Sequence, residues 1–347
     1  MNNKTAVVLM NLGGPDTLDS VYGFLRNLFN DPAILNLPGP FRNILSYIIA
    51  KKRTPLAKEI YKQIGGSSPI LTETISQAKE LEKFLDSENI KVFVSMRYWH
   101  PFSSETIRLI NKWRPSRVLI IPLYPQFSTT TTGSSIDDWT KNSKLFSNKV
   151  QTRIVCCYPI DKLFISAHLS LIKKELSQIK EKNTVRLIFS AHGLPESIIK
   201  KGDPYAWQVQ ETVKSIINNL NLDEENWVLS YQSKVTPVKW LEPSTEYEII
   251  RASKDKKKVI IIPIAFVSEH SETLVELDKE YYDLAISKGI TYYKRVPALG
   301  IQNQFIKCLA EIIRNNLNNF SDNLDINSSN GIRLCPTSFK NCRVKGI

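Results

Sequence analysis

Two histidines and a row of glutamates are the side chains of this sequence best suited to acid–base or metal chemistry. His192 follows an apolar run, and His270 precedes Glu272, Glu276 and Glu280, which recur every four residues. This spacing predicts three carboxylates on one side of a helix. Imidazole titrates near neutral pH, and imidazole with carboxylate suits a borderline divalent ion such as Fe²⁺ or Zn²⁺. The pattern indicates a path for cations or protons with a histidine at its mouth.

Less specific interpretations of the same residues stay open at this point. A single histidine in a turn commonly bonds the backbone, and a row of carboxylates is commonly a solvated helix face. Like charges at this spacing repel by only about 0.2–0.5 kcal/mol in water. Lys279 lies off the row and does not neutralise it.

Positive side chains indicate recognition of an anion. Lys51, Lys52 and Arg53 are consecutive, and Arg97 with Tyr98 ends an apolar run. Arginine suits bidentate carboxylate recognition, although a solvated basic patch explains the lysines equally well. The whole chain has 46 Lys and Arg against 34 Asp and Glu, a net charge of +12. This excess favours nucleic acid, an anionic membrane surface, or a substrate with carboxylates or phosphates.

The segment 33–49 is rich in apolar residues around Pro38-Gly39-Pro40 and precedes the basic residues. It predicts either a core helix or an apolar lip beside a cleft for a large flat ligand, in contact with membrane.

The elements that must position these residues alternate along the chain. Near-continuous apolar runs predict buried strands at 5–12, 91–98, 117–124, 152–158, 185–191, 227–232, 257–267 and 291–296. Amphipathic segments predict helices at 70–86, 103–113, 161–180, 204–220, 271–288 and 301–317. This alternation is typical of α/β proteins with parallel sheets, in which ligands bind beyond the carboxyl ends of the strands.

The second half of the chain repeats the first in outline. Asn11–Asp16 resembles Ser190–Glu196, Ser95–Pro101 resembles Ser230–Pro237, and Val118–Pro122 resembles Val259–Pro263. Three matches in the same order predict two related α/β domains. Their two ligand-binding edges would form a cleft if they faced each other.

Common motifs of other classes are missing from the sequence. It contains no GxGxxG, GxxxxGK[ST], CxxC, HExxH or GxSxG, so nucleotide, structural zinc, metalloprotease and serine hydrolase sites have no support. The five cysteines form no regular framework, which favours a reducing compartment. Without an apolar run of about 20 residues or a signal peptide, we expect a cytoplasmic protein.

Several ordered motifs resemble those of one known family, the ferrochelatases, over nearly the whole chain. They are Leu12–Pro15, Ile49–Pro55, Tyr61–Pro69, Met96–Tyr98, Tyr124–Ser128, Thr132–Ser135, Ser190–Pro195, Gly202–Tyr205, Tyr231–Lys234, Pro237, Trp240–Leu241 and Phe266–Tyr281. The resemblance implies insertion of Fe²⁺ into a porphyrin, the last step of haem synthesis, so the enzyme would be a lyase. It also implies two similar doubly wound, Rossmann-like domains with parallel four-stranded sheets and the porphyrin in the cleft between them.

We place the domain boundaries accordingly. Residues 1–163 with 298–320 form the first domain, which carries the apolar lip, and residues 164–297 form the second, which carries His192 and Glu272. Residues 321–347 are expected to be a flexible tail, given their Asn, Ser and Asp content.

The resemblance also implies roles for single residues. His192 matches the metal-binding, proton-accepting histidine and Glu272 its partner carboxylate, while His270, Glu276 and Glu280 match a polar path leading outward. Family members have a widened helical turn here, so the resemblance implies a departure from the plain 3.6-residue period of this row. The residues that match porphyrin-contacting positions are Leu12, Arg53, Tyr61, Ser68, Arg97, Tyr98 and Trp240. Leu12 is often Met in relatives.

One departure concerns the two-iron two-sulfur cluster that some ferrochelatases hold with four cysteines. The first-domain position matches Thr129, and the C-terminal segment has Cys335 and Cys342 with Ser338 between them. With two of four thiolates in place, we predict no cluster and no permanently bound cofactor.

The segment Leu12–Pro15 bears on which porphyrin the chain would use, and other functions stay open at this point. Leu12-Gly13-Gly14-Pro15 resembles enzymes that use protoporphyrin IX, whereas those using coproporphyrin III usually have a Tyr-containing sequence. Other candidates are a cobalt chelatase for a corrinoid precursor and a non-catalytic tetrapyrrole or metal carrier. Nucleic-acid binding lacks any motif. The positive charge that is not assigned to porphyrin binding suits peripheral contact with an anionic membrane. We expect this contact on the inner face of the membrane.

Overall fold

The computed structural model describes residues 4–220, 222–234, 238–318, 320–321 and 324–344. The chain divides into two compact units. The first unit comprises Met1–Cys157, Leu309–Leu334 and Arg343–Ile347, and the second comprises Tyr158–Cys308 and Cys335–Cys342. The observed divisions therefore lie at 157/158, 308/309, 334/335 and 342/343.

The sheet of the first unit consists of five parallel strands in the order β2-β1-β3-β4-β9. The strands are β1 (Thr5–Asn11), β2 (Ile90–Met96), β3 (Arg117–Pro122), β4 (Gln151–Cys157) and β9 (Asp325–Ser328). Every residue of β1 is buried because the strand lies inside a sheet covered on both faces.

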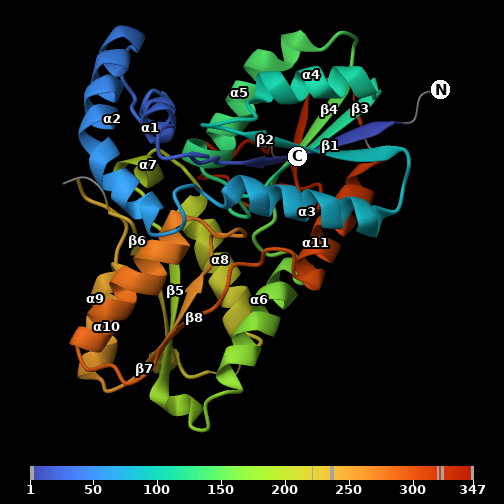
Figure 1. Cartoon of the computed structure of the whole chain (residues 1–347). Helices are drawn as coiled ribbons and strands as arrows, with labels where there is room; N and C mark the ends of the chain where they lie inside the picture. The colour runs from blue at the N-terminus through green and yellow to red at the C-terminus, as the bar shows by residue number, and fades with distance from the viewer. Residues whose placement is uncertain (1–3, 221, 235–237, 319, 322–323, 345–347) are drawn as a thin grey trace. The chain divides into compact units, whose positions relative to one another are not determined.

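Helices flank this sheet, as Figure 1 shows. α4 (Ser103–Trp113) and α5 (Ser134–Asn142) pack through Ile107, Ile110, Ile136 and Trp139 onto one face. α3 (Ile70–Leu85) and the later part of α11 (Asn303–Asn316) also belong to this unit. A short π-helix, η1 (Thr129–Gly133), follows β3 and leads directly into α5.

Two further helices of the first unit, α1 (Val21–Phe29) and α2 (Gly39–Lys62), pack against each other. Val21, Phe24, Ala50 and Tyr61 are among the residues that form their shared core. α2 contains an internal proline, Pro55, which removes one helical hydrogen bond and obscures the helix in the sequence. The segment 33–49 thus contributes to a helix whose apolar residues are partly exposed, rather than to a fully buried core helix.

The sheet of the second unit has four parallel strands in the order β6-β5-β7-β8. They are β5 (Val185–His192), β6 (Trp227–Gln232), β7 (Lys258–Pro263) and β8 (Tyr293–Arg295). The first four strands of each unit therefore follow the same spatial order, second-first-third-fourth. This agreement confirms the internal repeat and the two doubly wound domains expected from the sequence.

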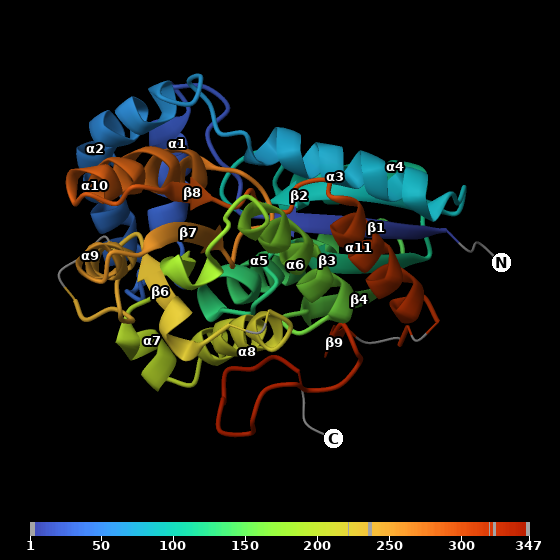
Figure 2. The same ribbon diagram turned by 90° about the horizontal axis from the view of Figure 1, so that it is seen from below.

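Helices cover both faces of the second sheet. α9 (Thr245–Lys254), the π-helix η5 (Glu272–Glu280) and α10 (Tyr281–Ser287) pack on one face through residues such as Ile249, Leu277 and Ala285. α6 (Lys162–Leu176) and α8 (Tyr205–Ile217) lie on the other side, as Figures 1 and 2 show. A short helix, α7 (Glu196–Lys200), follows β5. Short 3₁₀ turns occur at Ser143–Leu145, Lys182–Thr184 and Glu224–Asn226.

The C-terminal segment differs from the expected flexible tail. Residues 325–328 pair with β4 as the fifth strand of the first sheet, so that sheet does not stop at four strands. Residues 335–342 belong to the second unit, where the Asn341 amide donates to the Gly202 carbonyl and Phe339 lies 6.0 Å from Trp207. Contacts that are distant in sequence, rather than local propensity, give this segment its structure.

Candidate active site

His192 is the last residue of β5 and lies at the carboxyl end of the second sheet. Its Nδ1 is 2.9 Å from Oε2 of Glu272, the first residue of η5. The next residue, Gly193, has no room for a side chain, because a Cβ would lie 2.9 Å from the Gln232 carbonyl oxygen. The Tyr205 hydroxyl donates to the His192 carbonyl at 3.0 Å. The histidine is therefore fixed from β6, η5 and α8.

The carboxylate determines which nitrogen of His192 is reactive. Since ionised Glu272 can only accept a hydrogen bond, Nδ1 of His192 is the donor, and in neutral imidazole Nε2 then has the lone pair. Among the described residues nothing hydrogen-bonds to this Nε2, and 36% of the side chain is exposed. Nε2 is thus available to accept a proton or to bind a metal ion.

Burial lowers the pKa of His192, but the charges of Glu272 and Glu276 outweigh it and hold the pKa above its ordinary value. For Glu272, burial raises the pKa, and the neighbouring His192 and His270 outweigh this effect, so the pKa of the carboxyl lies below its usual range. The two partners stabilise each other's charged form.

Glu276 lies about one helical turn after Glu272 in η5, and both carboxyl groups contact the Ser233 hydroxyl. The Ser233 hydroxyl oxygen lies 3.0 Å from Oε2 of Glu272 and 2.5 Å from Oε2 of Glu276, so the two carboxyl groups share its single proton. The Ser233 amide and the Tyr281 hydroxyl donate to Oε1 of Glu276 at 2.8 and 2.9 Å. Burial and the nearby charge of Glu272 nevertheless raise the pKa of Glu276, so it takes up a proton more readily than an ordinary glutamate.

The helix that carries these carboxylates is a π-helix over all of Glu272–Glu280. The α-helical period assumed for the row of glutamates is wrong, and the widened turn that the family resemblance implies is confirmed. Glu272 and Glu276 both reach Ser233, while Glu280 is exposed at the outer end. The three carboxyl groups run from a partly buried position to solvent.

His270 presents the opposite hydrogen-bonding pattern from His192. Its Nδ1 accepts from the Glu272 amide at 3.0 Å, so the proton of the neutral ring lies on Nε2. Burial is the main reason why the pKa of His270 lies below its ordinary value, which keeps the ring neutral. Within the described parts of the chain, its buried Nε2 has no hydrogen-bond partner. His270 is therefore placed to donate a hydrogen bond rather than to accept a proton there.

Trp240 is the expected porphyrin-contacting residue of the second unit. Its ring lies edge-on to the His192 imidazole, with centroids 6.5 Å apart, and is largely buried. A bridge between Pro195 and Trp240 holds the two segments together. Another motif residue, Pro237, lies outside the described residues.

The other expected porphyrin contacts lie in the first unit, in different surroundings. Tyr98 is fully buried, and its hydroxyl donates to Asp31 at 2.8 Å. Arg97 donates to the same carboxylate at 2.8 Å. The Ser134 hydroxyl, at the start of α5, also donates to it. Asp31 therefore connects the end of β2 to the segment between α1 and α2. Apart from a turn-forming Asp-Pro pair, no local pattern in the sequence indicates this role of Asp31.

The remaining four expected contacts lie around α2 and β1. The Arg53 guanidinium lies 5.5 Å from the centre of the Phe29 ring. Tyr61 is buried in the core of α1 and α2, and Leu12 is partly buried and packs against this core. Ser68 packs closely on Gly14, where a Cβ would approach the serine to 2.4 Å.

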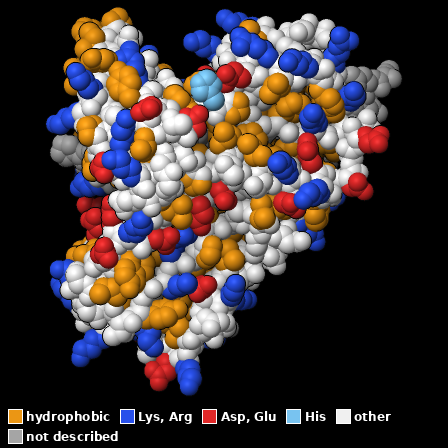
Figure 3. All heavy atoms as spheres, viewed as in Figure 1, with side chains coloured by type: hydrophobic (Ala, Val, Ile, Leu, Met, Phe, Trp, Pro, Cys, Tyr) orange, Lys and Arg blue, Asp and Glu red, His pale blue; other side chains and the backbone are white. Residues whose placement is uncertain are grey.

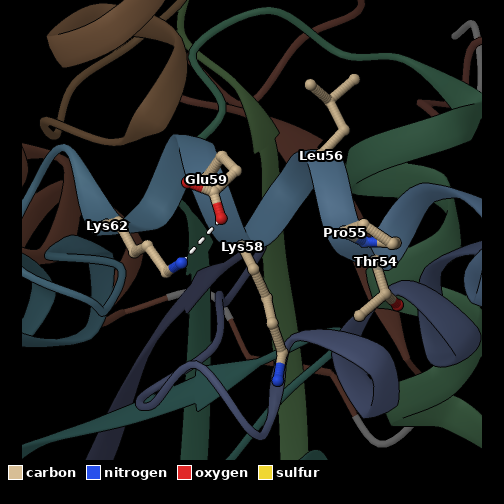
Figure 4. A pocket seen from close by; sticks show the side chains of 6 residues that line it. All are labelled: Thr54, Pro55, Leu56, Lys58, Glu59 and Lys62. Atoms are coloured by element: carbon tan, nitrogen blue, oxygen red, sulfur yellow. Dashed lines mark hydrogen bonds and ion pairs between the residues drawn. The ribbon is translucent and has the colours of Figure 1, made fainter.

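A pocket on α2 lies beside Arg53, and Figure 4 shows it. Its lining residues are Thr54, Pro55, Leu56, Lys58, Glu59 and Lys62. Lys62 pairs with Glu59 at 2.7 Å, whereas Lys58 points away toward Asp19 at 3.2 Å. The pocket has more positive than negative side chains, but Arg53 and Tyr61 do not line it.

Comparisons with known proteins decide the family. The ferrochelatase family model matches residues 4–317. This chain belongs to the ferrochelatase family. It is 50% identical over 344 residues to the ferrochelatase of Pelagibacter ubique, covering 98% of each chain. It is 48% identical to the ferrochelatase of Rickettsia bellii over 342 residues, covering 98% of this chain and 94% of the relative. Family membership supports metal insertion into a porphyrin, in haem synthesis, as its activity.

Solved structures show the same fold at low sequence identity. The chain resembles SirB from Bacillus subtilis with Fe³⁺, with a TM-score of 0.56 and 10% identity over 91% of this chain and 96% of that chain. It also resembles the sirohydrochlorin chelatase SirB in complex with cobalt, with a TM-score of 0.54 and 8% identity over 90% of this chain and 94% of that one. These similarities confirm the chelatase fold.

Proposed function

We propose that the chain inserts Fe²⁺ into protoporphyrin IX and releases two protons, as a protoporphyrin ferrochelatase. The observation that carries this proposal is the His192–Glu272 pair, in which a fixed carboxylate leaves Nε2 of the imidazole free. Each of the two pyrrole N–H protons must leave before four nitrogens can hold the metal. A base that titrates near neutral pH suits this step.

In this proposal His192 accepts the pyrrole protons, and Glu272 orients the ring and helps to dehydrate and position Fe²⁺. Glu276, with its raised pKa, takes over a proton, and Glu280 passes it to solvent. A single imidazole holds one proton at a time, so a relay is needed before the second proton can leave. His270 contributes a neutral N–H donor at the mouth of the same path.

The small number of candidate metal ligands supports an enzyme rather than a carrier. Across the described residues, no group of three or more His, Cys, Asp or Glu side chains is placed to hold a metal ion. A stable zinc-type site has three or four protein ligands. His192 and Glu272 would hold an ion weakly enough to give it to the porphyrin. Such a site also predicts insertion of Zn²⁺ and Co²⁺ in vitro.

Porphyrin recognition is proposed for Leu12, Arg53, Tyr61, Ser68, Arg97, Tyr98 and Trp240, as the family resemblance implies. Arg53 is the best candidate for a propionate, because its guanidinium contacts Phe29 and extends from α2 near the basic residues Lys51 and Lys52. Tyr98 would act from behind the pocket wall, since it is fully buried. Binding energy from the propionates would help to distort the macrocycle and expose its nitrogen lone pairs.

We propose further that the chain works without an iron–sulfur cluster. Thr129 begins η1, and the C-terminal segment offers Cys335 and Cys342 with Ser338 between them. The Cys335 sulfur is buried and accepts a hydrogen bond from the Gln208 amide at 3.0 Å. This donor set does not fit a cluster that needs four thiolates. Stoichiometric iron and acid-labile sulfide in the purified protein would overturn this proposal.

The principal experiment follows metal insertion by the absorption change of the porphyrin, with Zn²⁺ in air and Fe²⁺ without oxygen. We expect many turnovers per protein with protoporphyrin IX. His192→Ala should lower turnover at least about a hundredfold. His100→Ala should leave turnover near wild type, although His100 also pairs with a glutamate, Glu105, at 2.9 Å. Near wild-type turnover of His192→Ala would refute the assignment. Faster turnover of coproporphyrin III would favour the alternative substrate, and one equivalent of bound porphyrin without conversion would favour a carrier.

A second proposal concerns peripheral membrane contact. Phe41, Ile44 and Ile48 are 67%, 62% and 54% exposed and lie at spacings that share one face of α2. Figure 3 shows apolar side chains at the upper left, over α2, with positive ones nearby. Lys51 and Lys52 follow one turn later and are exposed. This arrangement suits an anionic membrane surface.

The test is cosedimentation with anionic and zwitterionic vesicles. Phe41→Ser with Ile44→Ser should lower binding to anionic vesicles, whereas Leu109→Ser, at another exposed apolar site of the first unit, should not. Equal binding of all variants would refute this proposal. No helix in the described part of the chain has the length and apolar character to span a membrane.

A further inference from the structure

Arg295, the last residue of β8, binds two carboxylates on the segment that contains η5. Its Nε and Nη2 donate to Oδ1 and Oδ2 of Asp278 at 2.6 and 2.7 Å. Its Nη1 donates to Oε1 of Glu269 at 2.9 Å. The guanidinium side chain is only 9% exposed, so water screens these contacts little.

The two carboxylates bracket the reactive part of the π-helix. Glu269 precedes η5, and Asp278 lies near its end, so His270, Glu272 and Glu276 fall between them. Glu269 Oε1 also accepts from the Ala298 amide at 2.9 Å, beyond β8. On the same strand, the Tyr293 hydroxyl donates to the Leu277 carbonyl at 2.6 Å. The strand therefore contacts η5 and its approach at several points.

A π-helix of this length needs such support. The π geometry is rare and usually limited to single turns, so the default conformation of the segment is an α-helix. A change of one residue in helical register turns a side chain by about 100° around the axis. A rotation of that size would remove Glu276 from the Ser233 hydroxyl and amide that it contacts now.

We propose that Arg295 is a positioning residue that holds η5 in its π conformation and so keeps Glu272 and Glu276 on Ser233. Its fork-shaped guanidinium is essential, because it donates in parallel to both oxygens of Asp278 while a third nitrogen reaches Glu269. A lysine supplies the charge but only a single nitrogen. The consequence for turnover rests on the proposed chelatase function, whereas the consequence for η5 does not.

The test compares Arg295→Lys and Arg295→Met with the wild-type chain in two measurements. The first is amide hydrogen exchange of peptides covering 270–282, which does not depend on activity. We expect exchange in this segment to be at least about tenfold faster in both variants. The second is steady-state metal insertion, in which kcat should fall about ten- to a hundredfold while KM for the porphyrin changes little.

A matched control is available at Arg186 of β5. Its guanidinium is also buried and pairs with Asp255 at 2.7 Å, but in the described part of the chain neither side chain forms a hydrogen bond or ion pair with η5. Arg186→Lys should leave both the exchange of 270–282 and kcat near wild type. If either Arg295 variant fails to fold, Asp278→Asn removes the negative charge that Arg295 binds on η5. This variant should give the same local increase in exchange.

The proposal would be overturned if residues 270–282 of Arg295→Met exchanged their amide hydrogens at the wild-type rate. It would also be overturned if Arg186→Lys accelerated this exchange as much as the Arg295 variants do. Full turnover of Arg295→Lys would also overturn it, since charge alone would then suffice. An inactive wild-type chain would refute the proposed function, and the exchange measurement would still decide the role of Arg295.

Discussion

The carboxyl edges of the two sheets have the same architecture and different side chains. In the second unit, His192 pairs in register with Gln232 at the end of the strand. In the first unit, the last pair is Asn11 with Met96, and the next residue, Leu12, corresponds to His192. The third strand of each sheet ends in a proline, Pro122 or Pro263. One edge thus has an imidazole where the other has an alkyl group, which indicates that acid–base chemistry belongs to the second unit.

A π-helix follows the third strand in both units, but the two helices differ in charge. η1 has the sequence Thr-Thr-Thr-Thr-Gly, and the carboxylate near its end, Asp31, accepts hydrogen bonds from Arg97, Tyr98 and Ser134. In η5, Glu272 and Glu276 share the Ser233 hydroxyl, and the charge of Glu272 helps to raise the pKa of Glu276. A fully satisfied carboxylate supports structure, whereas two competing carboxylates can exchange protons.

The largest expected effect tests this difference between the strand ends. His192→Ala should lower kcat for metal insertion by about 10²–10⁴, the usual contribution of a general base. Leu12→Ala, at the corresponding position of the first unit, should change KM for the porphyrin more than kcat. Initial rates of Zn²⁺ insertion at several porphyrin concentrations separate the two parameters. Equal losses of kcat would show that the two edges do not differ in their chemistry.

A second prediction compares the two carboxylates by stability. Asp31→Asn leaves Arg97, whose side chain is 19% exposed, without its main charge partner and should cost about 3 kcal/mol in the free energy of unfolding. Glu276→Gln should cost much less, because the raised pKa shows that the native site tolerates a neutral group there. Urea unfolding of both variants measures the difference. A larger loss in Glu276→Gln would contradict the assignment of roles.

A third prediction concerns pH. Because the pKa of His192 is raised, its proton-accepting form appears only as the pH rises through that higher value, so kcat/KM should increase with pH over this range. Glu272→Gln removes the charge that raises the pKa and should shift the titration of His192 to lower pH. NMR of the imidazole measures this shift without requiring turnover. An unchanged or higher pKa in the variant would contradict the proposed electrostatic coupling.

The smallest expected effect concerns Ser233, whose backbone has a positive φ of 63°. Ser233→Gly removes the hydroxyl shared by Glu272 and Glu276 but relieves the backbone, so we expect nearly unchanged stability and a loss of kcat of about tenfold or less. Ser233→Ala should lose similar activity and some stability as well. Full activity in both variants would show that the shared hydroxyl has no role in turnover.

Much of this fold was predictable because its strands are short apolar runs of fixed order. All eight expected runs contain the observed strands β1–β8 or overlap them, and the four-residue row of glutamates identified η5. β9 could not be predicted, since Asp-Ile-Asn-Ser has little β propensity and becomes a strand only by pairing with β4. Strands and amphipathic helices are local patterns, whereas this strand depends on a contact distant in sequence.

The candidate site was predictable to a lesser degree. His192 and Glu272 were found by residue type and family resemblance, and the structure brings them together. Asp31 and Ser233 acquire their contacts from residues 67 and 43 positions away, respectively, so no local spacing identifies them. The contacts of Arg295 with Asp278 and Glu269 were missed for the same reason, since these partners lie 17 and 26 residues earlier in the chain.

The placement of β9 also affects how the chain avoids self-association. Without it, β4 would be an edge strand with a row of unpaired amide and carbonyl groups, which can template pairing with other chains. β9 covers that row with four residues and adds an ion pair between Arg153 and Asp325 at 3.4 Å. The corresponding edge of the second sheet is β8, whose three residues offer little length for such pairing. The C-terminal segment thus provides the first sheet with protection that the second sheet obtains from a short edge strand.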